Sequence, residues 1–266
     1  MAIQISHLGD GDFSFESLDD TLPNAAKVHY HSRFEVYYLR KGVCWYFIDS
    51  KSYRLTSGDI ALIPAGIIHK TNYETETYSR SLFYCEDSYI PESVRDLLPS
   101  LPYFSGTGPV AEKISQIFAA IQKEHDEPDT FSQDILRSKA AELFLLIARE
   151  SRAEQPQKEE SPIVEKAVRY IQTHYMEAVT LQDVAKECFV SREHLSRSFK
   201  KETGFGFNEY LNVYRLKRAN SMLKEDSKSR VAEVALTCGF SDSNYFSKQY
   251  KKMFGISPNK SRKEGL

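Results

Sequence analysis

The chain contains little that would build a zinc site, a disulfide framework or a membrane span. Its 266 residues include only four cysteines, and no two of them form a C-x-x-C pair. Structural zinc and disulfides are therefore not expected. No apolar run reaches the roughly eighteen residues that a membrane helix needs, and no basic stretch followed by an apolar one marks a signal peptide after Met1. These absences favour a soluble protein in a reducing cytoplasm.

The net charge of −2 is the sum of two parts of opposite sign. Residues 1–161 contain 16 basic and 25 acidic residues, whereas residues 162–266 contain 19 basic and 12 acidic ones. A basic segment can neutralise phosphates, while an acidic segment is repelled by them. The length allows two domains with separate cores. We therefore expect the C-terminal part to bind nucleic acid and the acidic part to lie away from it.

One residue pattern occurs twice in the C-terminal part. Internal repetition indicates that one structural unit is used twice. The two copies share apolar, small and basic residues at matching positions: Val184-Ala185, Cys188, Ser191, Phe199-Lys200-Lys201 and Gly204 correspond to Val234-Ala235, Cys238, Ser241, Tyr250-Lys251-Lys252 and Gly255.

Each copy reads as two short helices joined by a tight turn. In the first copy Thr180 and Asp183 have the spacing of a capping box, so a helix should begin at Leu181. Ser191 is a new N-cap, and Ser241 is the corresponding cap of the second copy. The helix after each cap has a basic outer face, which is the pattern of a helix-turn-helix. A long helix, roughly 207–223, joins the copies and can present both to adjacent major grooves, which lie about 34 Å apart.

Residues 162–264 resemble the DNA-binding domain of AraC/XylS-type transcription regulators. The match includes the Leu-x-x-Val-Ala start and the Phe-Lys-Lys-x-x-Gly end of the first copy, and the run VALTCGFSDSNYFSKQYKKMFGISP from Val234 to Pro258. Phe189 stands where the family often has glycine, and Ser261 where it often has an aromatic residue. The resemblance implies a regulator that usually activates transcription through RNA polymerase and often responds to a sugar.

The second helix of each copy should present its outward N-terminal residues to base edges. Arg197 suits a guanine, Glu193 a cytosine amine and Asn244 an adenine. A solvated surface is the alternative for any single residue, but repetition favours base contact for the group. The predicted base-reading residues are Arg192, Glu193, Ser196, Arg197, Ser243, Asn244, Ser247 and Lys248, and the predicted phosphate contacts are Lys200, Lys201, Lys251 and Lys252.

Residues 1–105 have the pattern of many short strands. Runs rich in β-branched and aromatic residues alternate with Gly, Pro, Asp and Ser, which favours a small barrel or jelly roll. The expected strands are Val36–Leu39, Cys44–Ile48, Tyr53–Leu55, Ile60–Ile63 and Tyr78–Tyr84.

Two motifs in this region are similar to those of the cupin barrels. They read His29-x-His31-x-x-x-Glu35 followed by Gly42, and Gly58 followed by Pro64-x-Gly66-x-x-His69. In metal-binding cupins the matching three histidines and glutamate hold a divalent ion, and such ligands suit iron, manganese, zinc or nickel. Sensor barrels of AraC-type regulators use the same positions to bind a small molecule without a metal, so both alternatives stay open. The predicted effector-binding residues are His29, His31, Glu35, Tyr37, Trp45 and His69.

The barrel is followed by a helical pair and a linker. Apolar residues recur at helical spacing over 106–150, with a break at 126–129. The second helix is apolar on more than one face over 140–148, which makes dimerisation through this pair a hypothesis. Residues 151–161 are charged and nearly free of apolar side chains, as in a linker. The predicted fold is thus α+β multidomain: a cupin-like barrel with two helices, and an all-α domain over 162–266.

The functional hypothesis is a transcription regulator that binds promoter DNA under the control of a small effector in the barrel. One alternative is a metal-dependent cupin enzyme fused to a DNA-binding module. The barrel region contains no Ser-x-x-Lys pair, nucleophile elbow or phosphate loop, which argues against that enzyme. The other alternative is a DNA-binding dimer that needs no ligand.

Overall fold

The computed structural model describes residues 4–5, 12–23, 29–48, 51–67, 69–151, 162–225 and 229–264. The chain forms two compact units, which we describe separately. One consists of residues 160–266 with 1–5 and 27–29, and the other of residues 6–26 and 30–159. None of the described helices is both long enough and apolar enough to span a membrane. The predicted linker lies outside the described residues, apart from Ser151.

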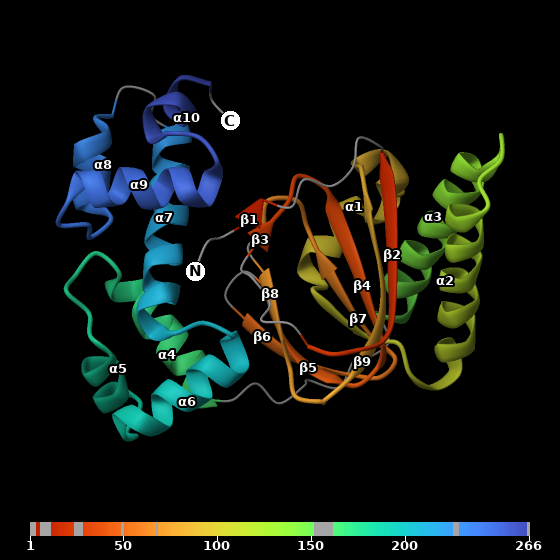
Figure 1. Cartoon of the computed structure of the whole chain (residues 1–266), viewed down its shortest axis with the longest axis horizontal. Helices are drawn as coiled ribbons and strands as arrows, with labels where there is room; N and C mark the ends of the chain where they lie inside the picture. The colour runs from red at the N-terminus through yellow and green to blue at the C-terminus, as the bar shows by residue number, and fades with distance from the viewer. Residues whose placement is uncertain are drawn as a thin grey trace. The chain divides into compact units, whose positions relative to one another are not determined.

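The N-terminal unit is built on two antiparallel sheets (Figure 1). The first has the order β10-β7-β4-β9-β2, with bounds Tyr103–Ser105, Asp59–Ile63, Phe34–Lys41, Tyr78–Cys85 and Phe13–Thr21. The second has the order β8-β5-β6, with bounds His69–Tyr73, Val43–Ile48 and Lys51–Thr56. Two short strands, β1 Gln4–Ile5 and β3 His29–Tyr30, belong wholly or partly to the other unit. The five expected strands are present, and β1, β2, β3, β8 and β10 are additions to them.

Alternation along the strands separates two cores, because successive side chains of a strand point to opposite faces. On β4, Tyr37 and Leu39 belong to a core inside the barrel, together with Tyr46 of β5 and Leu82 and Tyr84 of β9. The intervening residues of β4 belong to a second core on the outer face of the first sheet. The inner core contains the candidate ligand site, and the outer core holds the helices.

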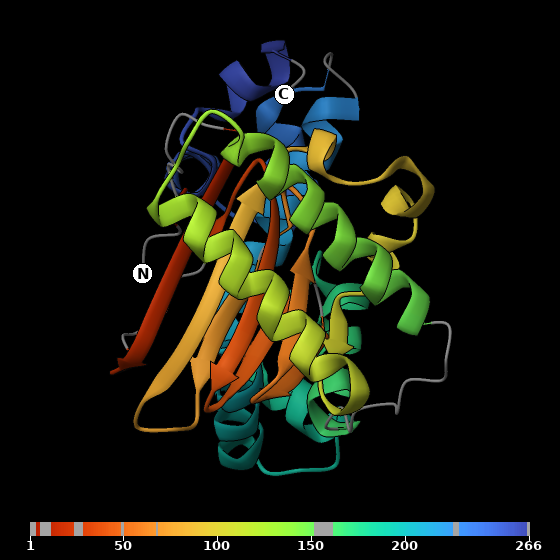
Figure 2. The ribbon, with the colours of Figure 1, turned by 90° about the vertical axis from the view of Figure 1, so that its right-hand side faces the viewer.

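Helices α2 (Ala111–Asp126) and α3 (Ser132–Glu150) cover that outer face (Figure 2), as the sequence predicts. Tyr38 stacks on Phe118 with ring centres 4.7 Å apart. Leu146, one of the apolar residues that made dimerisation a hypothesis, is buried within the unit, and Leu145 is 42 % exposed. Short helical turns connect the sheet to this pair: η1 Asp87–Tyr89, α1 Glu92–Arg95, η2 Leu98–Ser100 and η3 Gly108–Val110.

The described residues from 162 onward in the C-terminal unit are helical, and one long helix lies between two similar groups (Figure 1). Phe199 packs edge-on against Tyr210 of the long helix, with ring centres 5.4 Å apart, and Phe246 and Tyr250 are the buried residues at the matching places of the second group. The helices are α4 Pro162–His174, α5 Leu181–Glu187, α6 Arg192–Thr203, α7 Phe207–Glu225, α8 Val231–Thr237, α9 Ser243–Phe254 and α10 Pro258–Glu264.

Candidate functional sites

Helices α6 and α9 both begin at a side-chain cap. The Ser191 hydroxyl accepts a hydrogen bond from the His194 amide at 3.1 Å. The corresponding cap of α9 is Asp242, whose carboxylate accepts from the amides of Asn244 and Tyr245. The prediction that Ser241 caps α9 is therefore wrong. The second turn is one residue longer than the first, so the residue equivalent to Ser191 is the next one along the chain.

The N-terminal halves of α6 and α9 present the predicted base-reading residues to solvent. All of these side chains are exposed except Ser247, which is half-buried. Arg192 and Arg197 form no ion pair within the described part of the chain, so both guanidiniums are available for an outside partner. Tyr245, which was not among the predicted residues, is 44 % exposed and accepts a hydrogen bond from Asn212 Nδ2 at 3.4 Å.

The four predicted phosphate contacts lie later in the same helices. Lys200 and Lys201 fall in the last turn of α6, and Lys251 and Lys252 in the last turn of α9. All four side chains are exposed. Lysines at this distance from the helix start suit contact with the phosphate backbone rather than with base edges.

Both groups open onto the same side of α7. A groove of about 700 Å³ runs between them, and its walls include Thr180 at the start of α5, Ser241 and Tyr245 at the start of α9, and Asn212 and Arg215 of α7. In Figure 1 both α6 and α9 begin on this side and run across α7 in the same general direction. The common direction of α6 and α9 across α7 is the arrangement that the two-groove hypothesis requires.

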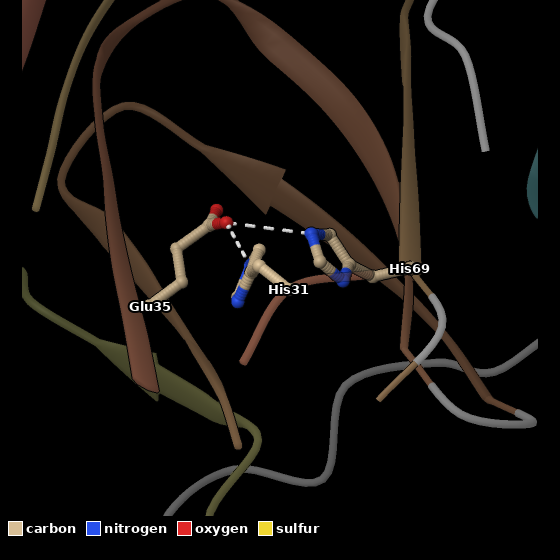
Figure 3. Close-up of side chains that lie close together, drawn as sticks. All are labelled: His31, Glu35 and His69. Atoms are coloured by element: carbon tan, nitrogen blue, oxygen red, sulfur yellow. Dashed lines mark hydrogen bonds and ion pairs between the residues drawn. The ribbon is translucent and has the colours of Figure 1, made fainter. Parts of the chain in front are cut away.

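Inside the barrel, His31, Glu35 and His69 come together (Figure 3). Glu35 Oε2 lies 2.8 Å from His31 Nε2 and 3.3 Å from His69 Nε2. The other carboxylate oxygen accepts a 2.7 Å hydrogen bond from the hydroxyl of Tyr46. All four residues are at most 2 % exposed. Tyr46 was not predicted, and its position on the opposite sheet is what brings it to Glu35.

Backbone carbonyls orient both imidazoles. His31 Nδ1 lies 2.7 Å from the Arg33 carbonyl, and His69 Nδ1 lies 2.8 Å from the Ile67 carbonyl. A carbonyl oxygen only accepts, so each Nδ1 carries the proton and donates it. Both Nε2 atoms then face Glu35. A histidine whose Nδ1 donates to a backbone carbonyl is held in the orientation in which its Nε2 can bind a metal.

The electrostatics of the cluster favour an ionised carboxylate. Burial alone raises the pKa of Glu35, but the attraction of His69 and the hydrogen bonds from both histidines hold that pKa well below its usual range. The three donor atoms lie within 4.8 Å of one another. Two imidazole nitrogens and a carboxylate thus fit a divalent transition metal. The side chain of His29, the predicted fourth ligand, lies outside the described part of the chain.

The two predicted aromatic wall residues lie in different places. Tyr37 faces the barrel interior, where its hydroxyl is 2.7 Å from that of Tyr73. Trp45 does not line that interior, so this prediction is wrong. Its neighbour Tyr46 takes the inward position on β5, and the Trp45 indole donates instead to Glu74 Oε1 at 3.0 Å.

Comparison with known proteins identifies both domains. A model of the AraC-like ligand binding domain matches residues 12–145, which is half of the chain, and a helix-turn-helix domain model matches residues 184–264. The chain belongs to the AraC family. As a member of this family it is a transcription regulator with an N-terminal ligand-binding domain and a C-terminal DNA-binding domain.

Several proteins are similar to this AraC-family chain. The transcriptional activator RhaS of Shigella sonnei is 24 % identical over 256 residues, covering 91 % of this chain and 90 % of RhaS. The structure of ToxT from Vibrio cholerae is 16 % identical, covering 94 % and 97 %, with a TM-score of 0.39. The C-terminal domain of AraT, a response regulator from Geobacillus stearothermophilus, is 37 % identical, covering 39 % and 86 %, with a TM-score of 0.37.

Proposed function

We propose that the chain is a cytoplasmic, non-enzymatic activator that binds two successive major grooves of promoter DNA and is controlled by a small effector in the barrel. The observation that carries the proposal is the pair of capped, exposed helix starts at Ser191 and Asp242, whose helices cross α7 in the same general direction (Figure 1). RhaS is named a transcriptional activator, which supports activation of transcription by this chain. RNA polymerase and a second copy of the chain are further proposed partners.

Selection of duplexes from a random library tests the DNA-binding part of this proposal. The full chain should enrich sequences with two recognition elements whose centres are about 10 base pairs apart, because one helical turn separates successive major grooves on one face. Binding should weaken steeply with salt, as expected when lysines displace counterions. Enrichment of a single element, or of none, would contradict the two-groove arrangement.

The effector part is tested by a thermal-shift screen of the full chain against sugars and divalent metals. A ligand at a hundred times its dissociation constant stabilises the folded protein by roughly 2.7 kcal/mol. His69→Ala should abolish the shift of any ligand that uses the histidine cluster. A ligand-independent dimer predicts no shift with any compound.

The cluster of His31, Glu35 and His69 supports a second candidate, a metal-dependent centre. A bound ion would supply a Lewis acid, and these three side chains would hold it. Mass-spectrometric metal analysis of the purified chain and of Glu35→Gln decides the matter. Stoichiometric iron or manganese that disappears in the variant supports the metal, and turnover by the loaded protein would favour an enzyme over a pure sensor.

A further inference from the structure

The barrel contains a second polar cluster, at the opposite end of its strands from the histidines. Arg80 lies on β9 two residues before Leu82 and therefore shares the inward face with Leu82 and Tyr84. Glu35 is near the start of β4, whereas Arg80 is in register with Leu39 near its end. The two clusters are connected through the rings of Tyr46 and Tyr37, whose centres are 4.9 Å apart.

The guanidinium of Arg80 is incompletely used. Its Nη2 donates to Glu16 Oε2 at 2.9 Å, while its buried Nη1 meets no hydrogen-bond partner among the described residues. The side chain is 14 % exposed. A buried N–H without a partner is costly, and such groups often mark the place of an absent ligand or ion.

The partner Glu16 is poorly anchored. It lies on β2, the edge strand of its sheet, and is 48 % exposed. An ion pair that is this open to solvent contributes about 0.2–1 kcal/mol. A carboxylate from outside can therefore replace that of Glu16 at the same guanidinium at little cost, and it occupies the volume that the departing side chain leaves.

The surroundings of Arg80 are rich in donors and aromatic faces. The Tyr37 ring centre lies 5.9 Å from the guanidinium carbon, and the hydroxyls of Tyr37 and Tyr73 share one hydrogen bond, so one of their two protons is free to be donated elsewhere. Burial raises the pKa of both phenols, which keeps them protonated. The rings of Tyr73 and Tyr78 stack at 3.7 Å and form an apolar wall. Acceptor-rich groups with an apolar body suit such a site.

We propose that Arg80 binds the carboxylate of an acidic effector, and that Glu16 occupies this position when the effector is absent. The ligand class is a monocarboxylate with an aromatic or apolar body, held by the planar fork of the guanidinium and covered by Tyr73 and Tyr78. The inference rests on the proposed role of the barrel as the effector domain, and it names the chemistry of the effector. The histidine cluster is a separate site at the other end.

Calorimetric titration of the full chain with benzoate, and with benzyl alcohol as the neutral isostere, tests the assignment. Benzoate should bind and benzyl alcohol should bind at least tenfold more weakly, because a charge-assisted hydrogen bond contributes about 1.5–3 kcal/mol. Arg80→Gln should weaken benzoate by about tenfold or more for the same reason. Arg80→Lys, which keeps the charge but loses the fork, should lie between the wild type and Arg80→Gln.

The direction in which Glu16→Gln changes the affinity for benzoate is the decisive result. Removing the internal competitor should tighten benzoate about two- to fivefold, since the pair it breaks contributes at most about 1 kcal/mol. If the Arg80–Glu16 ion pair is purely structural, Glu16→Gln should not tighten benzoate binding. If Glu16 is an acceptor in a sugar site, Glu16→Gln should weaken ligand binding. Either result overturns the proposal, as does the absence of benzoate binding to both the wild type and Glu16→Gln. Duplex selection is unaffected by these outcomes, so the DNA-binding proposal stands or falls separately.

Discussion

The two helix-turn-helix units begin their turns in the same way with different residues. Phe189 and Gly239 occupy equivalent positions, both with left-handed backbone (φ 57° and 82°). Their amides donate in the same way, Phe189 to the Lys186 carbonyl at 3.1 Å and Gly239 to the Leu236 carbonyl at 2.9 Å. Phe189 is 88 % exposed, whereas a Cβ at position 239 would lie 2.7 Å from the Tyr175 carbonyl oxygen. The turn demands a left-handed residue in both units, and only crowding makes glycine necessary in the second.

The units also stabilise their helix starts differently. In the first unit Thr180 and Asp183 form a complete capping box at α5. In the second unit α8 starts after Arg230 without a side-chain cap, whereas Asp242 caps α9 with two hydrogen bonds. The repeat therefore preserves helix positions and buried faces, while the local contacts that hold them are specific to each copy.

The largest expected effect is a difference in stability between substitutions in the two turns. Gly239→Ala should destabilise the helical unit by about 3 kcal/mol, because it adds left-handed strain and a clash with a backbone oxygen that cannot move aside. Phe189→Ala is the matched control: it keeps the left-handed backbone and removes an exposed ring with its cation–π contact to Lys166, so its effect should be no more than about 1 kcal/mol. Urea unfolding followed by circular dichroism measures both. Equal losses would contradict the role of crowding.

The second prediction contrasts base reading by the first unit with phosphate contact by the second. Arg197→Ala should cost about 1–3 kcal/mol on the selected DNA site and relax its sequence preference. Lys252→Ala should weaken selected and random duplex alike and lower the salt slope by about one. Fluorescence anisotropy over a salt series provides both quantities. If the two variants lose affinity equally on selected and random duplex, the assignment of roles is wrong.

The third prediction concerns the residue that differs between the buried faces, Phe199 in the first unit and Tyr250 in the second. The Tyr250 hydroxyl lies 2.6 Å from Asn220 Oδ1 and 2.8 Å from Ser261 Oγ. This network attaches α10 through Ser261, the residue that stands where the family often has an aromatic one. Tyr250→Phe should cost about 1–2 kcal/mol in urea unfolding, because it leaves buried polar atoms short of a partner.

Tyr245→Phe is the control for the third prediction, since its hydroxyl is solvent-exposed and makes only a 3.4 Å contact with Asn212. Its loss should stay below about 0.5 kcal/mol. A loss as large as that of Tyr250→Phe would show that the hydroxyl matters for reasons other than its burial.

The sequence predicted elements better where apolar patterning was strong. The strands it missed, such as β2 and β8, contain many polar residues, and β2 and β10 are edge strands. In the barrel site, the motif spacing anticipated that His31, Glu35 and His69 would meet. The face of the sheet to which Trp45 points was predicted wrongly. The turn at Gly42 (φ 107°) lies between β4 and β5, so the inward positions on β4 do not predict which positions of β5 point inward.

The part of the barrel that could not be predicted depends on contacts between sheets. No spacing rule brings Tyr46 of β5 to Glu35 of β4, because their distance depends on how the two sheets pack. Arg80 was also not foreseen, because its inward position follows from the register of β9 with β4 within one sheet. Residues joined by sequence motifs were foreseeable, and residues joined only by sheet packing were not.

The smallest expected effect concerns the left-handed phenylalanine itself. Phe189→Gly removes the strain of a left-handed residue, which costs about 1–3 kcal/mol. Two losses oppose this gain. Glycine gives the unfolded chain more freedom, at about 0.4–1 kcal/mol, and Lys166, whose Nζ lies 4.8 Å from the ring centre, loses a cation–π contact of about 0.5–1 kcal/mol. The midpoints of these three ranges leave a net gain of about 0.5 kcal/mol in urea unfolding.

Phe189→Val distinguishes strain from the loss of the ring. Valine also removes the cation–π contact, but its branched Cβ fits the left-handed region worse than phenylalanine does, so it should lose about 1 kcal/mol or more relative to the wild type. If glycine and valine give the same stability, backbone strain plays no part at this turn. The second unit would then need glycine for crowding alone, and the comparison between the turns would reduce to the space around position 239.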